Sequence, residues 1–134
     1  MVDEWVKKVW EEARREREEK IRKLKEISEA LDKVIDYVIA GNGSSDLLEL
    51  LTELQVKVDR KITRAVFDSK VSEIMEKYGY VDIDEGEREA VTEKKVGYIR
   101  LYYKDGRADS WFFVSDLKNH NVELYIDKSY EGGI

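Results

Sequence analysis

The chain contains no cysteine. This absence excludes disulfides, thiolate metal ligands and cysteine nucleophiles, and nothing in the composition indicates an oxidising compartment. The residues that follow Met1 also lack the basic, apolar and small-residue order of a signal peptide. No apolar run approaches the roughly 18 residues of a membrane-spanning helix. We therefore expect a cytoplasmic protein.

Thermolabile side chains are scarce, whereas charged side chains make up 40% of the 134 residues and leave a net charge of -6. Surface ion-pair networks gain value at high temperature, because the hydration of charged groups weakens there. The composition is therefore typical of a thermophile's protein. The acidic balance disfavours a long duplex DNA footprint built from phosphate contacts.

Signatures of cofactor chemistry are missing as well. The glycines form no phosphate-binding loop, dinucleotide fingerprint or nucleophile elbow. His120 is the single histidine and lies in a predicted loop, without spaced partners for a zinc site. The sequence predicts no cofactor and no metal site, with His120 as a polar turn residue.

The first part of the chain has a heptad pattern. Between Val6 and Val38, apolar residues recur at alternating spacings of four and three, which predicts one long helix that packs against another helix. The seam consists of Val6, Trp10, Ala13, Arg17, Lys20, Leu24, Ile27, Leu31, Val34 and Val38. Its polar gap, residues 14–20, is either a solvated stretch of helix or a contact with an acidic partner.

This helix stops at residues 41–45, where the glycines free the backbone to turn and the serines can cap the next helix. Asp46 with Glu49 has the spacing of a capping box. Apolar residues at helical spacing then continue to Tyr78, so we expect an antiparallel helical hairpin. A break near Asp68 would give three short helices before a hairpin, the order of a winged-helix module. That arrangement would place four basic residues on duplex DNA: Arg60, Lys61, Arg64 and Lys70.

From Tyr80 the apolar period changes to two. Residues 96–104 and 107–115 flank Asp105 and Gly106, a dipeptide that favours a two-residue type I′ hairpin turn. A third strand follows at residues 122–127, and residues 80–84 supply a fourth. The predicted fold is α+β: a long, coiled-coil-like helical hairpin (residues 1–79) packed on a three- to four-stranded antiparallel meander (residues 80–134), in one domain.

The type I′ turn sets Arg100 opposite Trp111 and so assigns the two faces of the hairpin. The face assigned to the core carries Ile99, Leu101, Phe112, Val114, Leu124 and Ile126. The other face carries Tyr98, Arg100, Tyr102, Trp111, Phe113 and Tyr125. So much aromatic area needs cover from the helices, a second copy or a stacked single-stranded nucleic acid, although Asp109 and Glu123 would repel phosphates.

One enzymatic alternative remains. Asp82 and Asp84, followed by Glu93, Lys94 and Lys95, resemble the acid and Glu-x-Lys layout of the restriction-endonuclease-like nucleases. The resemblance implies a divalent ion held by carboxylates and a lysine that steadies the attacking water. It covers this short segment only.

The interpretation we favour is a non-enzymatic, oligomeric interaction or adaptor protein. The first helix is longer than its partner can cover, which leaves Val6, Trp10 and Ala13 in need of another surface. We therefore predict a homodimer or a protein partner at Val6, Trp10, Ala13, Arg17 and Lys20. A nucleic-acid-binding protein that uses the aromatic sheet face or a winged helix is the alternative.

Overall fold

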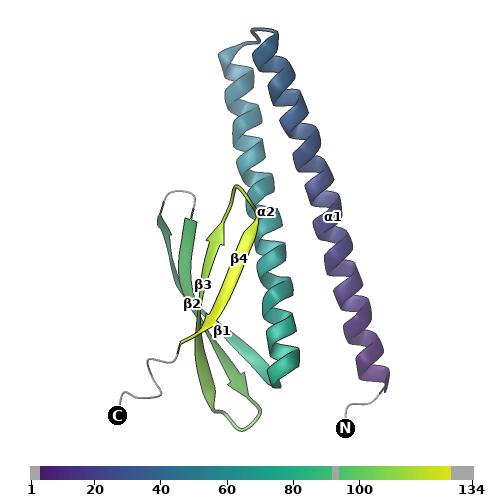
Figure 1. The fold of residues 1–134 in the computed structure, drawn as a ribbon, viewed down its shortest axis with the longest axis vertical. Coiled ribbons are helices and arrows are strands. Elements are labelled where there is room, and N and C mark those ends of the chain that lie inside the picture. Colours follow the sequence, from purple (N-terminus) through teal and green to yellow (C-terminus); the bar gives the residue numbers. More distant parts are fainter. Residues whose placement is uncertain (1–3, 92–93, 128–134) are drawn as a thin grey trace. The chain divides into compact units, whose positions relative to one another are not determined.

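The computed structural model describes residues 4–91 and 94–127, and within them the side chains of all residues except 86–95. Two helices, α1 (Glu4–Ala40) and α2 (Ser45–Tyr78), precede four strands (Figure 1). The strands are β1 (Tyr80–Val91), β2 (Lys94–Tyr103), β3 (Ala108–Asp116) and β4 (Asn121–Ile126). The α+β class is thereby confirmed, with the fourth strand present and longer than expected.

The chain divides into two compact units, residues 1–65 and 66–134, which we call the helical unit and the sheet unit. Their boundary lies inside α2, whereas the sequence placed the division at residue 79. Within the described residues, neither helix has a stretch both long and apolar enough to cross a bilayer.

In the helical unit, α1 and the first part of α2 run antiparallel and meet along a heptad seam. Gln55 donates a hydrogen bond from Nε2 to Ser28 Oγ at 2.7 Å, and this contact fixes the register of the two helices. The buried and half-buried residues along this seam include Ile21, Leu24, Ser28, Leu31, Ile35 and Val38 on α1, and Leu48, Leu51, Gln55, Val58 and Ile62 on α2.

Between Lys20 and Val38, this seam differs from the predicted one at three positions. Lys20 is exposed, and Ile21 is half-buried in its place. Ile27 and Val34 were assigned to the seam, but both are about half exposed, and Ser28 and Ile35 occupy the facing positions instead. Spacings of four-three and three-four both keep apolar residues on one stripe, so periodicity alone does not decide between them. The shift of one position leaves Ile27 and Val34 on the flank of the hairpin.

The loop between the helices satisfies exposed backbone groups at both helix ends. At the end of α1, the amides of Gly41 and Gly43 donate to Tyr37 and Val38 carbonyl oxygens. A Cβ on Gly43 would lie 2.5 Å from Val38 Cγ1, so this close approach requires glycine. Ser44 caps α2, because its Oγ accepts the Leu47 amide at 3.1 Å. The predicted serine cap is therefore confirmed at Ser44, whereas Asp46 lies inside α2.

The sheet unit contains an antiparallel meander of order β1-β2-β3-β4. Its turn between β2 and β3 has three residues, Lys104 to Gly106, and not two. The Gly106 amide donates to Tyr103 O, and Gly106 has a φ of 90°. This is a type I turn followed by a left-handed residue, the usual three-residue hairpin loop. It pairs Ile99 with Trp111 and Arg100 with Ser110.

The core of the sheet unit lies between α2 and one face of the sheet. Phe67 and Val71 of α2 pack with buried residues of the strands, and the Phe67 and Phe113 rings meet edge to face with centroids 4.8 Å apart. The strand residues of this cluster are Tyr80, Ile99, Leu101, Trp111, Phe113 and Val122. The opposite face of the sheet, which we call the outer face, points away from this core.

Candidate interaction surfaces

The helical unit has an apolar surface on one flank. Ile27 and Val34 precede the seam residues Ser28 and Ile35 by one position, and Leu47 and Leu54 precede Leu48 and Gln55. In an antiparallel helix pair, the residues that come one position before each seam residue lie on the same side of the pair in both helices. The flank patch therefore joins both helices. It consists of Ile27, Val34, Leu47, Leu50 and Leu54, with exposed fractions between 46% and 64%.

The opposite flank of the hairpin is mostly polar. Positions that follow the seam by one residue carry Lys25 and Asp32 on α1, with Ile39 near the helix end, and Thr52 and Asp59 on α2. Asp59 accepts a hydrogen bond from Gln55 Nε2 at 3.3 Å. The hairpin is thus amphipathic as a pair. An apolar flank beside a polar one marks the side on which further helices can pack.

The predicted interaction residues of α1 take different positions. Val6, Ala13 and Arg17 are half-buried, Trp10 is 39% exposed and Lys20 is exposed. Val6, Ala13 and Lys20 precede Ile27 by whole heptads and so lie on the same line of α1 as the flank patch. Sequence reasoning missed the leucines of α2 as surface residues, because their spacing also suits a packed seam.

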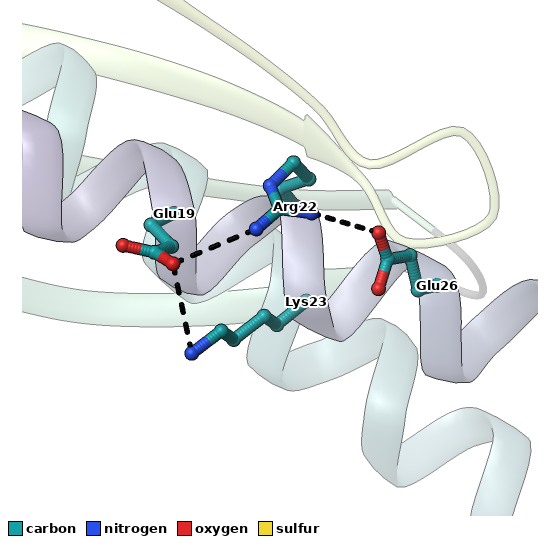
Figure 2. A network of polar contacts seen from close by, with 4 residues as sticks. All are labelled: Glu19, Arg22, Lys23 and Glu26. Atoms are coloured by element: carbon teal, nitrogen blue, oxygen red, sulfur yellow. Dashed lines mark hydrogen bonds and ion pairs between the residues drawn. The ribbon is translucent and has the colours of Figure 1, made fainter.

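Charged side chains of α1 form ion pairs along the helix. Arg22 contacts Glu26 at 2.9 Å and Glu19 at 3.5 Å, and Lys23 contacts Glu19 at 3.7 Å (Figure 2). The side chains remain more than half exposed, so each pair contributes only about 0.3–0.5 kcal/mol. These contacts lie at residues 19–26 and share only Glu19 with the polar gap of residues 14–20, in which Arg14 and Arg17 are half-buried.

The three-residue turn overturns the predicted faces of β3, whereas the residues of β2 and β4 lie on the faces predicted for them. A register shift of one residue moves every side chain of a strand to the other face. Trp111 and Phe113, predicted on the aromatic face, are 7% and 3% exposed in the core. Phe112 and Val114, predicted in the core, lie on the outer face with Tyr98 and Arg100.

The outer face keeps a smaller aromatic surface. Tyr98, Phe112 and Tyr125 are register partners across β2, β3 and β4, and we call them the ring row. The centroid distance is 6.4 Å between Tyr98 and Phe112 and 5.1 Å between Phe112 and Tyr125. Tyr98 is 56% exposed and Tyr125 is 45% exposed. Of the other residues predicted here, Arg100 is exposed and Tyr102 half-buried.

Acids outnumber bases around the ring row. Glu123 and Asp116 share the outer face with it, and Asp82 and Asp84 of β1 pair in register with Tyr102 and Arg100. Arg100 is the one described basic side chain of the strands on this face. Among the described side chains of this face, four carboxylates stand against one guanidinium, and this balance weakens the single-stranded nucleic-acid hypothesis.

A polar cluster lies on the core side of the sheet. Tyr80 donates to Asp109 Oδ2 at 2.6 Å, Tyr103 donates to the same oxygen at 2.9 Å, and Trp111 Nε1 donates to the Tyr80 hydroxyl at 3.1 Å. Burial and the Asp109 hydrogen bond raise the pKa of Tyr80 well above its usual value of 10.0. The cluster satisfies polar groups that the core would otherwise leave unpaired.

A shallow groove separates α2 from β4 in the sheet unit. Its volume is about 350 Å³, and its lining includes Glu73, Ile74 and Leu124. Lys70 Nζ donates to the Val122 carbonyl oxygen at 2.6 Å across it. A lysine that occupies an edge carbonyl discourages another strand from pairing there.

The described residues form neither the metal site of the nuclease alternative nor the winged helix of the duplex DNA alternative. Among the described residues no three His, Asp or Glu side chains could jointly hold a metal ion. Asp82 and Asp84 lie on the outer face, and Glu93 of the nuclease-like motif lies outside the described residues. The winged-helix arrangement is wrong, because α2 continues without a break through Asp68. His120 sits in the β3–β4 turn with a φ of 56°.

Comparisons with protein-family models, curated proteins and solved structures found no match to this chain. The candidate surfaces therefore stand on their geometry. The flank patch combines exposed aliphatic side chains from two helices, and the ring row combines exposed aromatic side chains with acids.

Proposed function

We propose that the chain is a non-enzymatic interaction protein that forms a homodimer through its helical unit. Two copies of the hairpin pack their flank patches together and form an antiparallel four-helix bundle. Such bundles build a shared core from apolar positions that a single hairpin leaves exposed. The proposal keeps the predicted dimer but moves the centre of its interface from the N-terminal residues of α1 toward the loop between the helices.

The observation that carries the proposal is the small core of the helical unit. Among its described aliphatic side chains, only Val58 and Ile62 are buried. A domain of about 60 residues buries roughly 60% of its unfolded surface and is only marginally stable, and long helices draw most of their stability from packing. Burial of five aliphatic side chains from each copy would supply the missing core.

The test is the molar mass of the full chain by size-exclusion chromatography with light scattering. At about 10 µM, a concentration at which interfaces of standard size persist, we expect twice the mass of one chain. Leu50→Glu places a charge in the flank patch and should give the mass of one chain. A monomeric wild-type chain would contradict the proposal.

Val56→Glu is the matched control. Val56 is also an exposed aliphatic residue of α2, 40% exposed, but it points away from both the seam and the flank patch. The same change of side chain there should leave the dimer intact. A Val56→Glu chain as monomeric as the Leu50→Glu chain would place the interface elsewhere.

Two further proposals concern the source and location of the protein. The ion pairs on α1 and the abundance of charge support a thermophilic origin. A cytoplasmic location is supported by the absence of cysteine.

A further inference from the structure

The ring row is the apolar centre of the outer face. Tyr98, Phe112 and Tyr125 cross three neighbouring strands side by side, and Val96 and Val114 continue the apolar area along β2 and β3. The Phe112 and Tyr125 rings are nearly parallel, with an interplanar angle of 25°. Rings held by adjacent strands of a sheet are fixed in position, so a ligand does not have to order them.

Carboxylates lie beside the rings. Glu123 of β4 is the register partner of Val114 of β3. Its Oε2 accepts a hydrogen bond from the Tyr125 hydroxyl at 2.5 Å. This bond holds the Tyr125 ring next to the Glu123 carboxylate. On the other side, Asp84 pairs in register with Arg100, so the positive charge of Arg100 has an acidic neighbour.

We propose that the outer face binds a lysine- and arginine-rich segment of a protein partner. Cations are attracted to the faces of aromatic rings, and guanidinium groups stack on them. The methylene stems of lysine and arginine can cover the exposed ring edges, while Glu123, Asp84 and Asp82 pair with the charged ends.

Charge complementarity favours a basic peptide segment over a nucleic acid or a second copy of this chain. A phosphate backbone would meet four carboxylates. A second copy packed face to face would set the same acids against each other, and like charges across an interface are costly. The binding surface belongs to the sheet unit alone and does not depend on the proposed dimer.

The experiment is calorimetric titration of the full chain with an amidated hexa-arginine peptide at about 0.15 M salt, a moderate ionic strength. We expect one peptide site per chain. Tyr98→Thr and Tyr125→Thr should each weaken binding at least about threefold, because each removes one cation–π partner from an exposed strand position that tolerates threonine. Glu123→Gln should weaken binding as well.

Glu53→Gln is the control, because it removes an exposed acid of α2 in the helical unit and changes net charge equally. Binding should be unchanged in this variant. Leu50→Glu should also bind with the wild-type affinity per chain, so a failure of the dimer proposal does not affect this test.

Three results would overturn the inference. The first is no binding of the peptide. The second is equal binding of the peptide to the wild-type chain and to both tyrosine variants. The third is binding of an oligouridylate in its place that is lost in those variants. The last result would identify the ring row as a nucleic-acid platform.

Discussion

The hydroxyl of Tyr80 both donates and accepts a hydrogen bond in the interior of the sheet unit. Tyr80→Phe removes it and leaves the Trp111 N–H without its acceptor. A buried donor that loses its partner costs about 1–3 kcal/mol. We expect the free energy of unfolding to fall by that amount, as measured by urea denaturation. Tyr103→Phe is the control, since it removes one donor to Asp109 without isolating Trp111, and should cost less.

The raised pKa of Tyr80 gives the protein a sensitivity to alkali. Below pH 10 this tyrosine is neutral in both the folded and the unfolded chain, so its contribution to the free energy of unfolding is fully present. Above pH 10 the unfolded chain loses the proton while the folded chain keeps it, and stability falls by about 1.4 kcal/mol per pH unit.

Urea denaturation at about pH 9 and about pH 11, either side of the usual tyrosine pKa, measures this effect. The wild-type chain should lose more stability between the two than the Tyr80→Phe chain. Equal losses in the two chains would show that Tyr80 has an ordinary tyrosine pKa in the folded protein.

At the scale of the element, the β2–β3 hairpin shows what the sequence could determine. Alternation and the Asp105-Gly106 dipeptide were enough to predict both strands and their turn. They did not fix the register, because Gly106 suits the left-handed position of a two-residue or a three-residue loop equally. That difference of one residue exchanged the faces of β3, so Trp111 and Phe113, two of the six residues of the predicted aromatic face, lie in the core.

Gly106 is the residue that holds this register. Its φ of 90° is unfavourable for other residues, and no atom lies within 4 Å of an added Cβ, so the cost of substitution is conformational. Gly106→Ala should destabilise the chain by about 1 kcal/mol. Gly106→Asn should cost less, since asparagine tolerates left-handed backbone. Thermal unfolding of both variants is the measurement, and equal effects would argue against the conformational origin.

The helical hairpin was predictable in outline for a related reason. Heptad spacing and the glycine-rich loop gave two helices, their direction and their approximate ends. The side of the seam on which Ile27 and Val34 fall depends on the partner helix, through the Ser28–Gln55 contact, and periodicity within α1 does not contain that information. Pairing with the other helix therefore decided the surface of the hairpin, and the length of one turn decided the surface of the sheet.

For the whole molecule, the proposed dimer couples stability to concentration. Binding between folded copies raises the midpoint of thermal unfolding as protein concentration rises. The wild-type midpoint, followed by circular dichroism, should increase by several degrees between about 1 µM and about 100 µM, a range that spans typical dimer affinities. The midpoint of Leu50→Glu should not change with concentration. A constant wild-type midpoint would contradict the dimer.

The charge-rich composition leads to a second prediction at this scale. If the protein comes from a thermophile, its unfolding midpoint should exceed the roughly 45–65 °C that is common among mesophilic domains. The same thermal scans provide this value, and a midpoint within the mesophilic range would remove the support for that origin.

The order β1-β2-β3-β4 means that described strands pair with their neighbours in sequence, through loops of a few residues. Contacts between strands are therefore close along the chain, which lowers the contact order and favours fast folding. Each strand can add to the preceding hairpin with little loss of chain entropy. Since the chain also contains no proline, isomerisation of X-Pro bonds cannot delay this zipping. The sheet unit is thus arranged to hide its apolar face soon after synthesis, before neighbouring chains can reach it.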